Sequence, residues 1–169
     1  IVRELRVTKF EPRDFELNIS RDADVRPLPI DIGDGCTLYI IGQIDRVDVY
    51  EKDGVSYIRI VDYKTGKKTF KLKDIKCGFN LQMLLYLASV VSGGKEKYGD
   101  NIVPAGVLYS NVLSSALSLS LGEDDIDEKS KETSKPVSSG IFLCDDEILF
   151  AMDPTENSTY IPIGRKNGE

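Results

Sequence analysis

The dipeptide Asp53-Gly54 is the feature that most constrains how this chain can fold. Segments rich in isoleucine, valine and tyrosine flank it over residues 38–50 and 55–63. Asp-Gly between two such segments is typical of a two-residue type I′ turn, because both turn residues must adopt positive φ. The sequence therefore predicts an antiparallel β-hairpin in which Lys52 pairs with Val55.

The register of this hairpin, taken as residues 38–64, predicts a metal site. Each step away from the turn moves back on one strand and forward on the other, so Asp45 is expected opposite Asp62. Lys64 shares the face of Asp62 because side chains alternate along a strand. Opposed carboxylates repel unless a cation compensates, and hard oxygen ligands favour Mg²⁺ or Mn²⁺. A purely structural salt-bridge cluster is the alternative.

The other face of the hairpin carries no expected function. The same register sets Asp48 opposite Arg59 and Tyr50 opposite Tyr57. We interpret these pairs as a structural, partly exposed surface.

The rest of the chain predicts an α/β domain whose helix packs on a mixed sheet. Asn80 is expected to cap a helix over residues 79–91. Its apolar stripe is expected to contain Leu81, Leu84, Leu85 and Ala88. Strands are expected at 4–10, 15–19, 102–112 and 160–163, with Pro12 joining the first two, a connection at 26–35, and a short helix at 145–152. The Ser-rich, acidic segment 112–140 is expected to be a mobile excursion.

Composition sets broad limits on the class of protein. A length of 169 residues with 41% apolar residues fits one domain over residues 1–169. The sequence contains neither a long apolar run nor a secretory leader, which predicts a cytoplasmic protein that does not enter membranes. The three cysteines, an odd number without a C-x-x-C pair, are expected to be reduced and partly buried thiols. Both ends look cut from a longer chain.

Charge is distributed unevenly along the sequence. The net charge of −6 argues against a generally basic nucleic-acid coat. Six lysines nevertheless stand between residues 64 and 76, against the single acidic residue Asp74, whereas residues 123–132 are mainly acidic. Lys67 and Lys68 are therefore candidates for a phosphate contact beside the site, and a solvated lysine-rich loop is the alternative on charge alone.

Three ordered motifs carry a resemblance to a known family. They are Gly-Gln-Ile-Asp-Arg-Val-Asp at 42–48, Val-Asp-Tyr-Lys-Thr-Gly at 61–66, and Gln82 with Tyr86 four residues apart within Asn-Leu-Gln-Met-Leu-Leu-Tyr-Leu at 80–87. Together they resemble the RecB-like branch of the PD-(D/E)XK nuclease superfamily. Within that branch the chain is similar to AddB-type nuclease domains, which belong to the B subunits of helicase–nuclease complexes. Spacing alone would make Gln82 and Tyr86 an ordinary helix face.

The resemblance implies a restriction-endonuclease-like core and a role for each motif residue. Asp45, Asp62 and the carbonyl oxygen of Tyr63 correspond to the ligands of Mg²⁺ or Mn²⁺, and Lys64 corresponds to the catalytic lysine. Gln82 and Tyr86 correspond to the helix that supports the site and the DNA strand. The function implied is a Mg²⁺-dependent deoxyribonuclease, of exonuclease type, that processes double-strand DNA ends in recombinational repair beside an AddA-like helicase subunit.

The resemblance also indicates what this chain lacks. The family's upstream acidic or histidine ligand has no counterpart, because the chain contains no histidine and begins at Ile1. Cys36, Cys77 and Cys144 do not match the clustered cysteines of the family's iron–sulfur cluster, which is expected only in the full-length parent. The isolated chain is therefore expected to be weakly active or inactive.

Two alternatives to this function remain at the level of sequence. One is a stand-alone RecB-like exonuclease related to the CRISPR adaptation nucleases. The other is a non-catalytic nuclease-like domain that guides DNA or holds a partner. Such domains typically lose the carboxylates or the lysine, so the presence of Asp45, Asp62 and Lys64 favours an enzyme.

Overall fold

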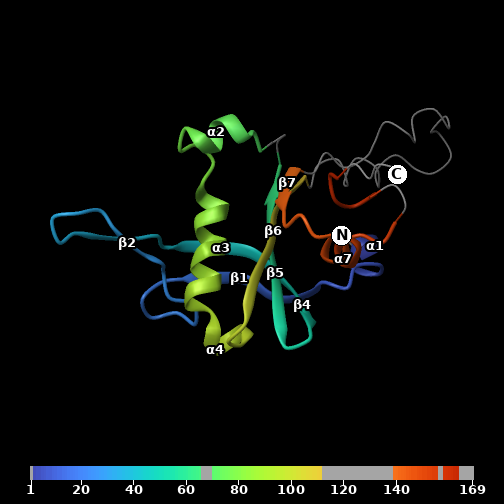
Figure 1. Cartoon of the computed structure of the whole chain (residues 1–169), viewed down its shortest axis with the longest axis horizontal. Helices are drawn as coiled ribbons and strands as arrows, with labels where there is room; N and C mark the ends of the chain where they lie inside the picture. The colour runs from blue at the N-terminus through green and yellow to red at the C-terminus, as the bar shows by residue number, and fades with distance from the viewer. Residues whose placement is uncertain (1, 66–69, 112–138, 156–157, 164–169) are drawn as a thin grey trace.

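A five-stranded sheet of order β1-β4-β5-β6-β7 forms the centre of the computed structural model, which describes residues 2–65, 70–111, 139–155 and 158–163 (Figure 1). Its strands are β1 (Glu11–Ile19), β4 (Gly42–Lys52), β5 (Val55–Lys64), β6 (Ile102–Asn111) and β7 (Ser139–Phe142). The pair β5–β6 is parallel and the other neighbouring pairs are antiparallel. The predicted α/β class with a mixed central sheet is therefore confirmed.

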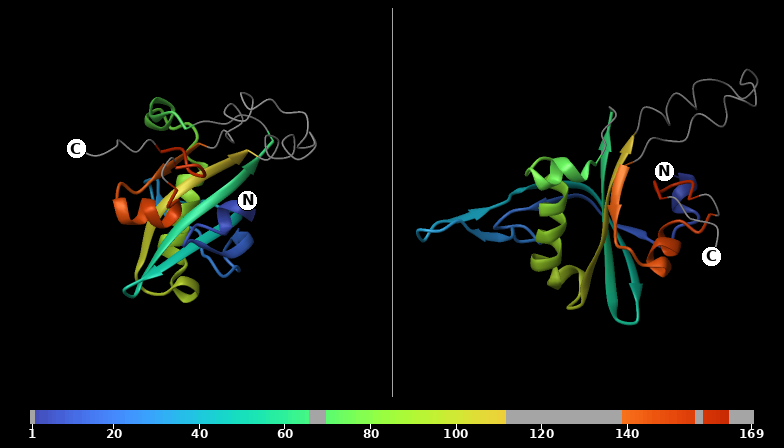
Figure 2. Two further views of the ribbon diagram at one scale, coloured as in Figure 1. Left: turned by 90° about the vertical axis from the view of Figure 1, so that its right-hand side faces the viewer. Right: turned by 45° about the horizontal axis from the view of Figure 1, so that its top comes forward.

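Helices cover both faces of this sheet. On one face, α2 (Leu72–Lys76), α3 (Gln82–Gly93) and α4 (Lys95–Tyr98) form the crossover that a parallel pair such as β5–β6 requires. On the other face lie α1 (Val2–Leu5) and α7 (Asp146–Met152) (Figure 2). Among the described residues, no helix is both long and apolar enough to cross a bilayer.

The turn between β4 and β5 has the predicted geometry. Asp53 and Gly54 both have positive φ, at 51° and 75°. Lys52 pairs with Val55, and the same register continues without interruption to Arg46 opposite Val61. The expected hairpin register is thus confirmed over this length.

The α3 side of the sheet holds the main apolar core. The hairpin contributes Val47, Val49, Ile58 and Ile60, all of them buried. The helix contributes Met83, Tyr86, Leu87 and Val90 to the same core.

The predicted helix over 79–91 was displaced, and its predicted apolar stripe was wrong. Asn80 has a φ of 58°, a left-handed conformation outside the extended range of an N-cap, and the helix begins at Gln82. Leu81, Leu84, Leu85 and Ala88 are only partly buried, although Leu84 packs against the edge of the core. Two apolar stripes with helical spacing overlap in this segment, and the one containing Tyr86 faces the sheet.

The N-terminal segment also differs from the prediction. Residues 4–10 do not form a strand, since α1 and a turn occupy most of them. Pro12 does not join two strands but lies inside β1, where the register shifts. Proline is tolerated there because β1 is an edge strand. The connection at 26–35 contains β2 (Pro29–Asp31), which pairs with β3 (Thr37–Tyr39) in a separate small sheet.

In the C-terminal half, one predicted strand and one predicted helix are confirmed, and one predicted strand is wrong. The strand at 102–112 corresponds to β6, and the helix at 145–152 corresponds to α7, whose first turn is capped by Asp145. Residues 160–163 do not form the expected strand. The expected mobile excursion covered residues 112–140. Residues 139–140 belong to β7, which was not predicted, and residues 112–138 lie outside the described residues. The three cysteines are free but exposed, not partly buried.

A buried ion cluster lies in the sheet on the side of α1 and α7, where a partly exposed surface was expected. The predicted pairing of Asp48 with Arg59 is present, yet both side chains are 0% exposed. Arg59 Nη2 donates to Asp48 Oδ2 at 2.7 Å and to Glu4 Oε1 at 3.0 Å. Arg46 Nε lies 2.7 Å from Asp48 Oδ1. The two guanidinium groups and two carboxylates balance each other, which explains how they are accommodated in the interior.

Removing one charge from this buried ion cluster should destabilise the fold. Asp48→Asn is expected to lower the free energy of unfolding by about 3–5 kcal/mol, because it leaves two buried guanidinium groups with only the Glu4 carboxylate as counter-charge. Arg13→Ala is the control, since its ion pair with Glu51 is exposed and should contribute at most about 1 kcal/mol. Urea denaturation of both variants measures the difference. Equal losses would contradict the role given to the cluster.

Candidate functional site

Asp45 lies beside β5 at the end of the hairpin ladder. The last residue pair in register is Arg46 with Val61, so a direct Asp45–Asp62 pair would come one step beyond it. At this step Asp45 Oδ2 accepts a hydrogen bond from the backbone N–H of Tyr63 at 2.8 Å. The Asp45 carboxylate thus takes the place of the backbone carbonyl that would accept this bond in a regular ladder. The carboxylate is therefore held against the peptide that joins Asp62 to Tyr63.

Asp62 and Lys64 lie together on one face of β5, as predicted. Lys64 Nζ is 2.5 Å from Asp62 Oδ2, and the two side chains are 35% and 17% exposed. This oxygen is buried, and the ammonium group of Lys64 is its ionic partner. A carboxylate offers about four lone-pair sites, so this ion pair leaves acceptor capacity on Asp62 for a second cation.

Tyr63 is held from both sides. Its backbone N–H donates to Asp45, and its hydroxyl group accepts a hydrogen bond from Arg46 Nη1 at 2.5 Å. Burial raises the pKa of Tyr63, while the adjacent Arg46 acts in the opposite direction. Because Arg46 belongs to the buried ion cluster, the cluster fixes the side chain of the residue whose carbonyl oxygen is a predicted ligand.

The N-terminal turn of α3 docks against the first motif strand. Gln82 Nε2 donates to the hydroxyl group of Tyr86 at 3.0 Å. This hydroxyl lies so close to Gly42 that a Cβ atom on Gly42 would overlap with it. The first motif therefore requires glycine at this position for a packing reason, and the contact joins Gln82 and Tyr86 to the strand that carries Asp45.

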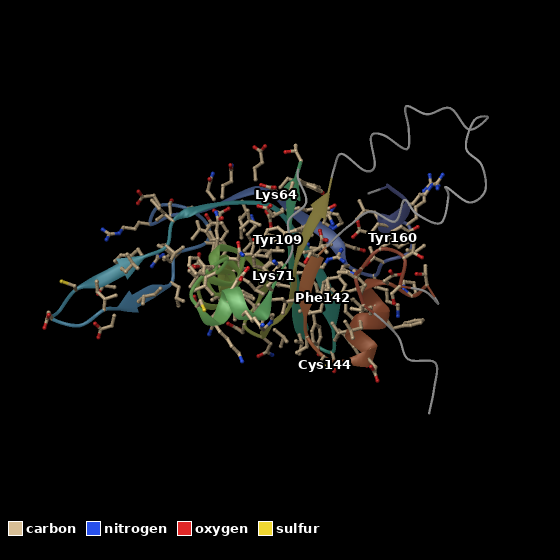
Figure 3. All side chains as sticks on the ribbon, turned by 90° about the horizontal axis from the view of Figure 1, so that it is seen from above. Lys64, Lys71, Tyr109, Phe142, Cys144 and Tyr160 are labelled. Atoms are coloured by element: carbon tan, nitrogen blue, oxygen red, sulfur yellow. The ribbon has the colours of Figure 1, made fainter. Side chains whose placement is uncertain are left out.

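Tyr109 is a site neighbour that sequence reasoning missed. It pairs with Asp62 in the parallel register of β5 and β6 and is 3% exposed. Its ring stacks on Phe70 at 4.5 Å, and Lys64 Nζ lies 5.9 Å from the ring centroid (Figure 3). Burial and the Asp62 carboxylate both raise the pKa of Tyr109. The sequence predicted strand β6, but only its register relative to β5 would have identified Tyr109.

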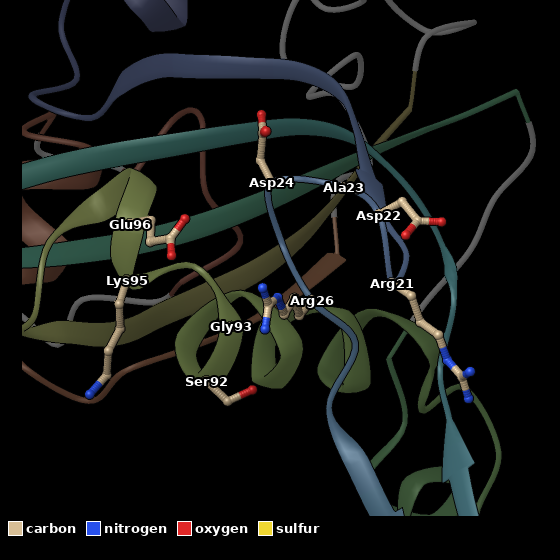
Figure 4. Close-up of a pocket in the computed structure, with 9 residues that line it drawn as sticks. All are labelled: Arg21, Asp22, Ala23, Asp24, Arg26, Ser92, Gly93, Lys95 and Glu96. Atoms are coloured by element: carbon tan, nitrogen blue, oxygen red, sulfur yellow. The ribbon is translucent and has the colours of Figure 1, made fainter.

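The remaining candidates fall outside this arrangement. Lys67 and Lys68 lie outside the described residues. Across the described ranges, no group of three or more acidic, cysteine or histidine side chains gathers as a metal site. A surface hollow near the C-terminal end of α3, lined by residues such as Arg26, Gly93 and Lys95, contains none of the predicted site residues (Figure 4).

Comparisons with known proteins identify the family and the relatives of this chain. The family model for the PD-(D/E)XK nuclease superfamily matches residues 2–154. The B subunit of an ATP-dependent helicase/deoxyribonuclease from Clostridium acetobutylicum is 32% identical over 90% of this chain and 13% of its own length. Proteins of the same name from Clostridioides difficile and Alkaliphilus oremlandii are 31% and 30% identical over 97% and 100% of the chain. The chain spans about 13–15% of the length of these relatives.

The contact between Gly42 and Tyr86 can be tested by a double-mutant cycle. Gly42→Ala is expected to lower the free energy of unfolding by about 1–3 kcal/mol, because the new Cβ atom overlaps the tyrosine ring. In a Tyr86→Leu background the overlapping atoms are absent, so the same change should cost at least about 1 kcal/mol less. Denaturation curves of the four proteins give the coupling. Strictly additive losses would show that the two residues do not interact.

Proposed function

We propose that this chain, which belongs to the PD-(D/E)XK nuclease superfamily, is the metal-dependent DNA nuclease domain in the B subunit of a helicase/deoxyribonuclease. The observation that carries the proposal is the Asp62–Lys64 pair on β5, with the Asp45 carboxylate held against the next peptide. The similarity to proteins named as B subunits of an ATP-dependent helicase/deoxyribonuclease supports DNA as substrate and a helicase subunit as partner.

The side chains present fit a divalent cation. Asp45, Asp62 and the carbonyl oxygen of Tyr63 are hard oxygen donors, and the Asp62 side chain is only 17% exposed. Three protein ligands of this kind suit Mg²⁺ or Mn²⁺, which keep several positions for water and phosphate oxygens. When bound, such an ion lowers the pKa of a water ligand and stabilises the negative charge that develops at phosphorus.

In this proposal Lys64 is the group that acts on the reacting atoms. Its ammonium group has three donors, so the ion pair with Asp62 leaves donors for a further acceptor. The amine can therefore orient the attacking water or hold a phosphate oxygen of the scissile bond. The centroid of the Tyr109 ring lies 5.9 Å from the ammonium nitrogen. Gln82 and Tyr86 hold the adjoining edge of the site in place.

The proposed biological setting is the processing of double-strand DNA ends. A helicase subunit of the AddA type would separate the strands in the cytoplasm and deliver one of them to Asp45, Asp62 and Lys64. The nuclease would then cut the delivered strand by hydrolysis of phosphodiester bonds, with exonuclease activity as the outcome. The non-catalytic guiding domain is the contrasting possibility that the following experiment distinguishes.

Substitutions in the site should separate cutting from unwinding in the complete helicase–nuclease complex. Asp62→Ala or Lys64→Ala is expected to reduce cutting of one strand at least about 100-fold, since each removes a group that acts on the reacting phosphate. Unwinding should persist because neither residue belongs to a motor. The assay is strand-specific digestion of end-labelled duplex DNA with ATP and Mg²⁺. Asp100→Ala, at an exposed position away from the site, is the matched control.

Two outcomes of this assay would decide against the proposal. If both variants degrade both strands at the parental rate, the catalytic assignment is wrong and the guiding domain is the better interpretation. If cutting is also lost in the Asp100→Ala control, the losses reflect a general effect on the complex and not the chemistry of Asp62 and Lys64.

Metal binding by this chain alone provides a second test. Mn²⁺ is expected to bind with a dissociation constant of roughly millimolar order, because only two carboxylates and one carbonyl oxygen supply the site. Asp62→Asn should weaken binding about tenfold or more, whereas Asp100→Asn should not change it. Electron paramagnetic resonance of free Mn²⁺ measures both affinities. Identical binding curves for the two variants would remove Asp62 from the ligand set.

A further inference from the structure

An exposed aromatic ring stands at the corner between α2 and α3. Phe79 is 67% exposed, which is unusual for a phenylalanine side chain. The ring projects from an ordered turn, since the backbone N–H of Phe79 donates to the carbonyl of Asp74 at 2.8 Å and that of Gly78 to Ile75 at 2.9 Å. With Gly78 at a φ of 84°, these bonds form a Schellman motif.

The same motif explains why the ring is left outside the core. In a Schellman motif the residue after the glycine usually packs on an apolar residue in the last turn of the helix. The corresponding residue of α2 is Asp74, which offers no apolar contact. Phe79 is therefore held outward by the backbone and lacks the usual partner within its own helix.

Three exposed lysines belong to the same corner as this ring. Lys71, Lys73 and Lys76 are all exposed, and in the described part of the chain no carboxylate forms an ion pair with any of them. This local excess of positive charge contrasts with the net charge of −6 of the whole chain. Lysines beside an exposed aromatic ring are the combination that binds single-stranded nucleic acid, in which a base is free to stack.

Both ends of this corner are joined to the candidate site. At its start, Phe70 stacks on Tyr109, the partner of Asp62 in the sheet, so Lys71 follows directly after a site contact (Figure 3). Ser139 Oγ also accepts a hydrogen bond from the Phe70 N–H at 2.8 Å, which ties this segment to β7. At its end, α3 begins with Gln82, which contacts Tyr86 above Gly42.

We infer that the α2–α3 corner is a binding platform for single-stranded DNA, with Phe79 stacking on an unpaired base and Lys71, Lys73 and Lys76 contacting successive phosphates. This inference rests on the proposed nuclease function and names the substrate form that the site receives. Duplex DNA would present phosphates to the lysines but no free base to the ring. The platform thus selects a strand that has already been separated.

Photocrosslinking tests the position of the strand without requiring cleavage. A photoreactive phenylalanine analogue replaces Phe79 in the full-length subunit with its helicase partner, and forked DNA with a single-stranded tail is bound in the presence of EDTA. The analogue at position 79 is expected to crosslink to the tail. The matched control replaces Phe150, which is 49% exposed on α7, on the opposite face of the sheet, and should give no crosslink. Equal yields at the two positions, or none at 79, would overturn the inference.

Cleavage kinetics of the same complex test the chemistry of the contacts. Phe79→Ala should raise KM for the strand roughly tenfold, as expected for the loss of one stacked base, and Phe79→Tyr should restore it. Lys73→Gln and Lys76→Gln should each reduce the slope of log(kcat/KM) against log salt by about 0.7. Lys95→Gln, an exposed lysine on α4 at the other end of α3, should leave the slope unchanged.

The two proposals fail in different ways. If Asp62→Ala abolishes cutting while the Phe79 and lysine variants behave like Lys95→Gln, the platform is wrong and the catalytic site stands. If Asp62→Ala leaves cutting intact, the proposed function fails. Crosslinking at position 79 then shows by itself whether the platform binds single-stranded DNA.

Discussion

The carboxylate of Asp48 lies between two buried guanidinium groups, and the two strands of the site hairpin are tied together at this point. Arg59 belongs to β5 and Arg46 to β4, so the contact spans the hairpin. A slip of one residue in register would move these charges to the opposite, apolar face, where nothing would balance them. Arg46 also contacts the hydroxyl group of Tyr63, so the charge balance within the sheet extends to the strand end that carries the candidate ligands.

The α3 side of the sheet positions the site by packing instead of charge. Tyr86 rests on the backbone of Gly42, and Phe70 stacks on Tyr109. These two aromatic contacts fix the position of the β5–β6 crossover at its end near Lys64. One face of the sheet near the site carries the buried ion cluster, and the other face carries the apolar core. Contacts on both faces restrict the positions of Asp45 and Asp62.

The sequence was sufficient for features set by local rules and insufficient for those set by packing. The turn at Asp53-Gly54 determined the hairpin register, and strand alternation placed Lys64 beside Asp62. Tyr109 could not be found, because the register of a parallel pair depends on a long crossover and not on a turn. Alternating charges at Asp48 and Arg59 resembled an exposed face, since nothing local indicated that α1 would supply Glu4 as a further counter-charge.

The contact made by Glu4 has a practical consequence for defining the smallest unit of this fold. Its carboxylate lies 3.0 Å from Arg59 and 3.6 Å from Arg46, in a group that otherwise contains two positive charges and one negative charge. A shortened version that began at β1 would leave one excess positive charge in the interior of the sheet. The segment that precedes β1 is therefore an integral part of the folding unit, and a boundary for recombinant expression should be placed ahead of it.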